Sequence, residues 1–291
     1  MIEIVGAGLA GLLAGNMLRS AQHKIFEAQD ELPNNHSAVL RFRSNIVGEA
    51  LGIDFKRVTM IKATAPWTNP IADALAYSFK NTAVYRSDRS IIAGTVVDER
   101  WIAPPDLIAR MSKGLNIEYR HRYTFGNHSP VISTIPMPKL MAILQYHRIP
   151  KFTFNSGVNM HAKIRSCDAY VSLLVPDPAN PISRISITGD ELIVECIGTN
   201  AELPARVAQL LGLPVNAFTD ISYHKQQYAK IAPIDDQERK QFMFWATDKH
   251  GIFSLGRFAT WRPKLLMDDL VQDVRKIGRW INDRYEMVRV R

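Results

Sequence analysis

Three glycines near the start of the chain have the spacing of a loop that binds phosphate. The segment is a G-x-G-x-x-G pattern made of Gly6, Ala7, Gly8, Leu9, Ala10 and Gly11. In such loops the first glycine allows a tight turn and the second lets the backbone approach a pyrophosphate. The third lets the following helix pack closely on its sheet. The N–H groups that begin this helix then face the phosphate oxygens. The pattern predicts dinucleotide binding.

The residues around the glycines predict the strands and helix that this loop requires. Residues 2–5 are apolar enough for a short buried strand, and leucines at helical spacing follow Gly11. Ile25 and Phe26 indicate a second strand, and Glu27 ends it. A carboxylate about 20 residues after the first glycine accepts hydrogen bonds from the ribose hydroxyls of an adenosine. An acid at this place argues against a ribose 2′-phosphate, and so against NADP.

The rest of the chain alternates between two kinds of pattern. Residues 131–135 predict a strand that ends at Pro136, and residues 251–257 predict another that ends in Gly256-Arg257. A long helix follows, with one apolar face formed by Leu266, Leu270, Val274, Ile277, Ile281 and Tyr285. Between about 150 and 245 the chain instead predicts antiparallel strands, including a hairpin that turns at Gly189-Asp190. We therefore expect an α/β fold with an inserted, mostly antiparallel β domain.

Composition bounds the class of protein and the kind of partner. Hydrophobic residues make up 46% and charged residues 22%, the balance of a globular domain rather than a disordered or collagen-like chain. No signal peptide or membrane helix is expected, and Cys167 and Cys196 are interpreted as buried thiols of a reducing cytoplasm, without a metal site. The net charge of +8 indicates either a solvated basic surface or a polyanionic partner. One early group of cations comprises Arg41, Arg43, Lys56 and Arg57.

The motifs at the two ends of the chain resemble those of the amine-oxidase-like flavoproteins, which include UDP-galactopyranose mutase and protoporphyrinogen oxidase. The resemblance is carried by V-G-A-G-L-A-G at residues 5–11, by Gly256-Arg257 and by Trp261 with Met267-Asp268. It implies an FAD cofactor with Arg257 near the pyrophosphate, the backbone at Met267 near the flavin, and Thr134 in a loop that returns to the dinucleotide. Where the family has a Gly-Gly-Arg, this chain has residues 34–36, so the role falls to Arg43.

The resemblance also implies how the chain divides into domains. A Rossmann-like FAD-binding domain would comprise residues 1–36, 85–136 and 246–291. A substrate domain would comprise residues 37–84 and 137–245. Because the chain is shorter than the usual members of the family, the substrate domain is reduced, which suits a large partner.

A narrower resemblance concerns the reaction. A short, basic flavoprotein of this family is similar to the flavin-dependent enzymes with which bacteriophages hypermodify thymidine in DNA. That resemblance implies oxidation of a C–N bond of glycine linked to thymine, with release of glyoxylate. A flavoenzyme for a free amine or nucleotide sugar, and a non-catalytic flavin protein, are the alternatives.

Flavin chemistry needs few acid–base side chains, so the catalytic candidates are few. His224 and Lys225 lie on a strand predicted for the substrate domain, and His250 precedes the strand that ends in Gly256. Lys225 could bind a substrate carboxylate. Trp261 could stack on a base or a flavin, although core packing is the simpler interpretation. Arg41, Lys56 and Arg57 are the candidates for contact with nucleic acid or substrate.

Overall fold

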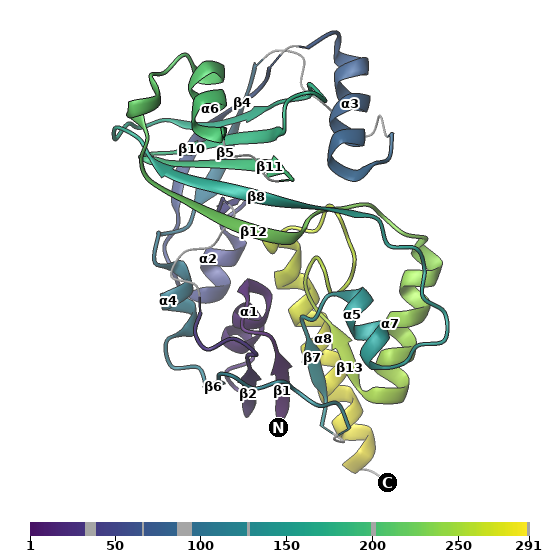
Figure 1. Cartoon of the computed structure of the whole chain (residues 1–291). Helices are drawn as coiled ribbons and strands as arrows, with labels where there is room; N and C mark the ends of the chain where they lie inside the picture. The colour runs from purple at the N-terminus through teal and green to yellow at the C-terminus, as the bar shows by residue number, and fades with distance from the viewer. Residues whose placement is uncertain (33–38, 66, 86–94, 127–128, 199–201, 290–291) are drawn as a thin grey trace.

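The computed structural model describes residues 1–32, 39–65, 67–85, 95–126, 129–198 and 202–289, and it contains two sheets (Figure 1). The first is a five-stranded parallel sheet in the order β13-β7-β1-β2-β6. Its strands are β1 (Ile2–Val5), β2 (His23–Phe26), β6 (Ile117–Glu118), β7 (Val131–Ser133) and β13 (Ile252–Ser254). All five end at the same edge, because the sheet is parallel throughout.

Helices cover both faces of the parallel sheet. On one face lie α1 (Leu9–Met17), α2 (Ile46–Leu51), α4 (Leu107–Ser112) and α8 (Met267–Arg289). On the other face lie α5 (Met137–Ile143) and α7 (Asp236–His250). Successive strand residues point to opposite faces, so Ile4 packs under α1 while Val5 packs with α5 and α7. The sheet is therefore buried on both sides, as parallel sheets are.

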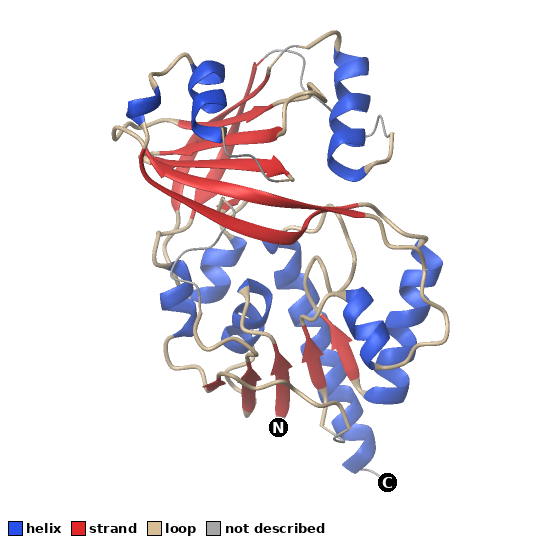
Figure 2. Ribbon diagram, viewed as in Figure 1, coloured by secondary structure: helices blue, strands red, loops and turns tan. Residues whose placement is uncertain are grey.

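The second sheet has eight strands in the order β12-β8-β11-β10-β9-β4-β5-β3, and Figure 2 shows it as a curled layer beside the first. Its strands are β3 (Arg41–Phe42), β4 (Lys56–Thr64), β5 (Thr95–Ile102), β8 (Phe154–Lys163), β9 (Tyr170–Leu174), β10 (Ile182–Thr188), β11 (Glu191–Ile197) and β12 (Thr219–Ile231). Every pairing is antiparallel except β4 with β9. Helix α6 (Leu203–Leu211) packs on one face, and α3 (Pro70–Thr82) contacts β8, β10 and β12.

The α/β fold and its mostly antiparallel second sheet were expected from the sequence and are confirmed, but the chain divides at other places. Strand β5 joins the eight-stranded sheet, although residues 85–136 were expected in the cofactor domain. Helices α2, α5 and α7 pack on the parallel sheet, although residues 37–84 and 137–245 were expected in the substrate domain. Of the two cysteines, Cys196 is buried and Cys167 is exposed, so the expectation of two buried thiols is wrong for Cys167. No helix within the described residues is long and apolar enough to span a membrane.

The contact between α1 and the end of β1 leaves no room for a side chain. A Cβ atom on Gly11 would lie 1.9 Å from the carbonyl oxygen of Gly6. We expect Gly11→Ala to lower the free energy of unfolding by about 1–3 kcal/mol, because the overpacked helix must move off the strand. This loss should appear although alanine is the better helix former.

Gly8→Ala is the matched control, and urea denaturation measures the free energy of unfolding of both variants. A Cβ atom on Gly8 would meet nothing within 4 Å, and the residue has φ −70° and ψ 178°, which any residue adopts. Measured on proteins without bound cofactor, its free energy of unfolding should stay within about 0.5 kcal/mol of the wild-type value. Equal stability of the two variants would contradict this account of the α1–β1 contact.

Candidate functional site

The glycine loop lies at the edge where the parallel strands end, and it leaves open space in front of α1. Gly6 follows β1 with φ +95°, and a Cβ atom there would come within 2.1 Å of Thr134 Oγ1. Thr134 follows β7, and both its N–H and its hydroxyl donate to the carbonyl of Val5, at 2.9 Å each. Gly8 is the N-cap of α1 and has no side chain to bond the free N–H groups. The helix N-terminus can therefore receive an anion.

Glu27 stands beside this loop, directly after β2. Its Oε2 accepts the N–H of Ala7 at 2.7 Å, and its Oε1 accepts the N–H of Gln29 at 2.9 Å. These bonds fix the carboxylate next to the glycines. An ionised carboxylate has about four acceptor sites, so both oxygens can still accept hydroxyl groups from a ligand. The sequence-based placement of this acid at the sheet edge agrees with the structure.

The segment after β13 returns to the same place. Gly256 has φ +105°, and a Cβ atom on it would lie 3.1 Å from the Cβ of Ala10 in the first turn of α1. The backbone N–H of Leu255 donates to Ser133 at the end of β7, at 2.9 Å. Arg257, the next residue after Gly256, is therefore held close to the glycine loop. The structure thus brings the glycine loop at residues 6–11 next to the Gly256-Arg257 segment near the other end of the sequence.

Arg43, which was expected near the pyrophosphate, pairs with an acidic side chain of the protein. Its guanidinium pairs with Asp269 in the first turn of α8, with Nη2 2.5 Å from Oδ1. Asp268 accepts the N–H and the hydroxyl of Ser44, both at 2.9 Å. These bonds tie the start of α2 to the start of α8, where Met267 is the first helical residue. Arg43 thus acts as a link between two helices here, and residues 34–36, where the family motif would stand, lie outside the described residues.

One face of the eight-stranded sheet, which we call the inner face, points toward the parallel sheet and carries charged side chains. Strand register aligns Arg184 of β10, Glu195 of β11, Asn159 of β8 and His224 of β12 in one row across the strands. The opposite face carries the apolar residues that pack on α6. The row therefore faces the layer that holds the glycine loop (Figure 2).

Glu195 is the buried centre of an ion-pair group on this face. One of its oxygens pairs with Arg184 and the other with Lys230. Burial alone would raise the pKa of Glu195, but the charges of Arg184 and Lys230 outweigh burial and hold that pKa well below its usual range. Burial lowers the pKa of Lys230 to about 8, against the opposing effect of Glu195. Glu195 is therefore ionised at neutral pH.

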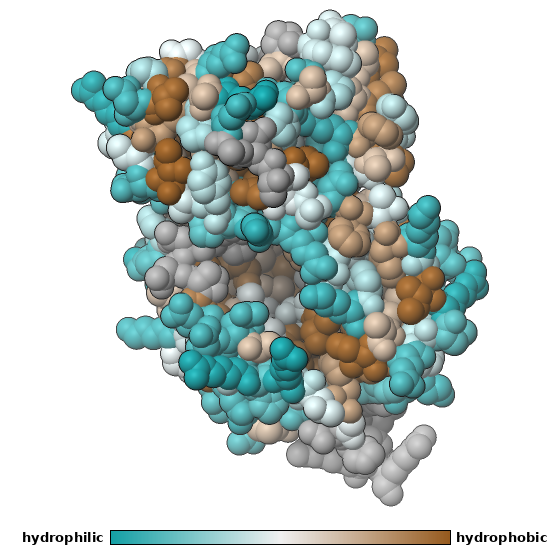
Figure 3. Space-filling view, viewed as in Figure 1, coloured by the Kyte–Doolittle hydropathy of each residue, from teal (hydrophilic) through white to brown (hydrophobic). Residues whose placement is uncertain are grey.

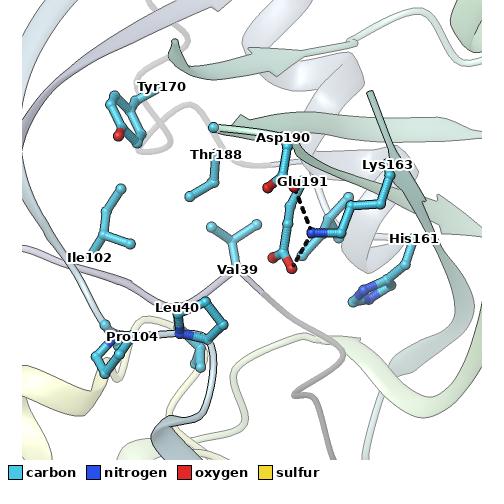
Figure 4. Close-up of a pocket in the computed structure, with 14 residues that line it drawn as sticks. Val39, Leu40, Ile102, Pro104, His161, Lys163, Tyr170, Thr188, Asp190 and Glu191 are labelled. Carbon is cyan, nitrogen blue, oxygen red and sulfur yellow. Dashed lines mark hydrogen bonds and ion pairs between the residues drawn. The ribbon is translucent and has the colours of Figure 1, made fainter. Parts of the chain in front are cut away.

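A cavity of about 250 Å³ lies between the inner face and the segments 39–40 and 102–105. The surface is hollowed where the two layers meet (Figure 3). From the sheet, the cavity is lined by His161, Lys163, Tyr170, Thr188, Glu191 and Ile193. Figure 4 shows Lys163 held between Asp190 and Glu191, with Nζ–oxygen distances of 3.0 and 3.3 Å. The volume suits a small ligand or one group of a larger one.

The three predicted catalytic residues fall in three different places. His224 is on the inner face, with its ring centroid 4.7 Å from that of His161, a cavity residue that the sequence analysis missed. Lys225, the next residue of β12, points to the opposite face. His250 ends α7 ahead of β13, at the sheet edge opposite to the glycine loop. The geometry therefore supports His224 and the neighbouring His161 as candidate catalytic residues. It gives no support to Lys225 or His250 in that role.

The basic group of residues 41–57 comes together on the neighbouring strands β3, β5 and β4. Lys56 Nζ lies 3.3 Å from an oxygen of Asp168 and 2.8 Å from the Tyr170 hydroxyl, and Arg57 pairs with Glu99. Both pairs are exposed. Arg41 instead turns inward and donates to the carbonyl of Val171 at 3.1 Å. Of the predicted cluster, Lys56 and Arg57 therefore lie on the surface, whereas Arg41 points into the interior.

No family model matches the sequence, and no curated protein matches it either. Solved structures do match. A reduced UDP-galactopyranose mutase has a TM-score of 0.65 and 13% identity, over 97% of this chain and 95% of its own. An oxidoreductase from Methanosarcina mazei has a TM-score of 0.57 and 11% identity, over 96% and 99%. Aklavinone-11 hydroxylase in complex with FAD and aklavinone has a TM-score of 0.50 and 16% identity, over 88% and 56%. The chain has the Rossmann-type fold of FAD-binding flavoproteins.

Trp261 was a candidate for stacking on a base or flavin, and the structure corrects this. Its side chain is 1% exposed, and its Nε1–H donates to the carbonyl of Ala232 at 2.8 Å. Its ring packs edge-on against Phe152 and Tyr228. Trp261 therefore joins the segment after β13 to the end of β12, and no ligand reaches its ring.

We expect Trp261→Phe to lower the free energy of unfolding by about 1–3 kcal/mol, because the buried carbonyl of Ala232 loses its donor. Chemical denaturation measures the effect. Trp67→Phe is the matched control, since Trp67 is 45% exposed and should change stability by less than about 0.5 kcal/mol. A Trp261→Phe protein as stable as this control would show that the hydrogen bond contributes little.

Proposed function

We propose that this chain is an FAD-dependent oxidoreductase whose cofactor lies across the ends of the parallel strands. The observation that carries the proposal is the open space at Gly8, enclosed by the N-terminus of α1, by Glu27 and by the Gly256-Arg257 segment. Each of these parts matches one part of a dinucleotide: pyrophosphate, ribose and compensating charge. The fold shared with UDP-galactopyranose mutase and with an FAD-bound hydroxylase supports the same cofactor.

Each group of the cofactor has a residue that fits it. The first N–H groups of α1 would bind the pyrophosphate, and Arg257 would balance its charge. Glu27 would accept the ribose hydroxyls, and the start of α8 at Met267 would face the flavin, as the family resemblance implies. FAD bound in this way supplies a two-electron acceptor. The substrate must then meet it from the side of the inner face, which is the layer opposite the glycine loop.

Gly8→Val tests the cofactor site without disturbing the fold. Because a Cβ atom on Gly8 meets no protein atom, the variant should unfold at the same denaturant concentration as wild-type protein from which the flavin has been removed. Its side chain would stand where the phosphate oxygens must lie, so we expect the purified variant to lose most of its flavin absorbance. A fully yellow Gly8→Val protein would show that the cofactor does not lie there.

For the reaction we propose oxidation of a C–N bond next to a carboxylate. The C–H bond of R–NH–CH₂–COO⁻ would give its hydride to the flavin and the N–H its proton to a base, leaving a C=N bond. Water then splits the imine into R–NH₂ and glyoxylate. His161 and His224 are side chains of the right type to accept the proton, and the inner-face cations could hold the carboxylate. A free small-molecule amine or nucleotide sugar, and a flavin protein without turnover, are the alternatives.

The narrower proposal is that R is thymine in phage DNA. Lys56 and Arg57 support it, because their exposed ion pairs are each worth only about 0–1 kcal/mol and can exchange an acidic partner for a phosphate. The cavity would receive a flipped base rather than a duplex, since chemistry on a base requires it to leave the stack. The partner would then be DNA that carries modified thymidine, in the cytoplasm of the host cell.

Anaerobic mixing of the yellow protein with glycinyl-modified substrates tests both levels of the proposal. We expect the flavin to bleach and one glyoxylate to appear per flavin, faster with the modified oligonucleotide than with the modified nucleoside at low salt. Free glycine and unmodified DNA are the controls. Equal, salt-independent rates for the nucleoside and the oligonucleotide would support amine oxidation but contradict the proposal that DNA is the substrate. No bleaching with any amine would contradict the oxidation itself.

A further inference from the structure

One group on the inner face of the eight-stranded sheet, made of Arg41, Arg184, Lys230 and Glu195, holds more positive than negative charge. Glu195 uses both oxygens, one on Arg184 and one on Lys230, so two cations already share one carboxylate. Burial and the charge of Arg184 lower the pKa of Arg41, whose guanidinium donates a hydrogen bond to the backbone carbonyl of Val171 at 3.1 Å. In the described part of the chain, no acidic side chain hydrogen-bonds to Arg41. The group has three cations for one anion, and the neighbouring Arg100 has its own partner in Asp98.

Two of the three cations, Arg41 and Lys230, have lowered pKa values, whereas Glu195 raises the pKa of Arg184 against the effect of burial. Burial, with the charges of Arg184 and Arg100, lowers the pKa of Arg41 to about 9. The pKa of Lys230, lowered first by burial, is lowered further by Arg184 and by Arg257. A buried cation without a full counter-charge is costly, whereas the same cation paired with an anion is tolerated. The group is therefore incomplete without a further negative charge.

The position of the group shows where that charge would come from. Leu40 and Ile102, next to Arg41 in sequence and in register, line the cavity. Ile193 of β11 also lines the cavity, and Glu195, two residues farther along β11, lies on the same face of the sheet. Toward the other side, Tyr228 of β12 contacts Trp261 and Phe258, which follow Arg257. The cations thus lie between the cavity and the segment that returns to the glycine loop.

We infer that Arg41, Arg184 and Lys230 form the seat for an anionic group of the substrate, a carboxylate or a phosphate, at the inner face of the sheet. The seat orients the substrate so that the rest of it extends toward the cofactor edge. The inference rests on the proposed flavin site for its direction, but the charge imbalance stands independently of it. The proposed pyrophosphate site is a different one, because it lies at the start of α1 on the other sheet, although the charge of Arg257 also affects Lys230.

Anion binding by the purified protein tests this seat without any turnover. The probes are sodium glyoxylate and inorganic phosphate, with neutral acetamide as control, each titrated at constant ionic strength while the midpoint of thermal unfolding is followed. We expect both anions to raise the midpoint and acetamide to leave it unchanged. Arg41→Gln should weaken the apparent Kd of each anion about ten- to a hundredfold, the effect of one lost hydrogen bond to a charged group, with unchanged flavin content.

Two further variants keep the test decisive. Arg206→Gln removes an equal charge from α6 on the opposite face, where Arg206 pairs with Glu202, and it should bind the anions as the wild type does. Glu195→Gln should have a lower unfolding midpoint without anion and a larger increase with it, because Arg184 and Lys230 lose the carboxylate that they share. A Glu195→Gln protein that fails to fold leaves the Arg41→Gln comparison intact.

Three results would overturn the inference. One is an unfolding midpoint of the wild type that no anion raises. Another is an Arg41→Gln variant that binds both anions with wild-type affinity. The third is loss of flavin from Arg41→Gln with a normal anion response, which would assign the cations to the cofactor phosphate. Anion binding that depends on Arg41 in a protein without FAD would instead refute the proposed function and leave the seat in place.

Discussion

The approach of α1 to the end of β1 is the contact on which the cofactor edge depends. The Cα of Gly11 lies so close to the carbonyl of Gly6 that no Cβ fits between them. This contact fixes the direction of α1, and the direction of α1 fixes where its free N–H groups point. Thr134, Ala10 and Gly256 then pack around the same few backbone atoms. A dinucleotide site made mostly of backbone needs this precision, because backbone groups cannot adjust as side chains can.

The inner face is built in the opposite way, from side chains on strands that are distant in sequence. Arg41 comes from β3, Arg184 from β10, Glu195 from β11 and Lys230 from β12. The strand order of the sheet, rather than any local motif, brings them together. Long-range pairing of this kind specifies a cluster only if the register is fixed. The hairpin β10–β11 with its turn at Gly189, and the apolar residues under α6, fix it here.

This difference explains how much could be predicted from the sequence. The glycine loop, Glu27 and the Gly256-Arg257 return were predictable, because each depends on local spacing. The turn of the β10–β11 hairpin was predictable for the same reason. The role of Arg184, Glu195 and Lys230 was not, because single charged residues on strands look like solvated surface until the register aligns them. Helix α7 was missed because its polar sequence resembles a loop, and its burial rests on few residues, among them Phe242 and Ala246.

The reaction must be argued from the inner face, because the fold does not determine it. A mutase and a hydroxylase share this architecture with the chain, so the same cofactor layer serves different chemistries. The second sheet of this chain presents its own set of side chains to the cofactor edge. In this chain that set is a row of polar groups with an excess of buried cations and a pair of imidazoles. A neutral substrate would leave the cations unbalanced, whereas an anionic one completes them. On the proposed anion site, the charge of the substrate is thus the property for which the inner face selects.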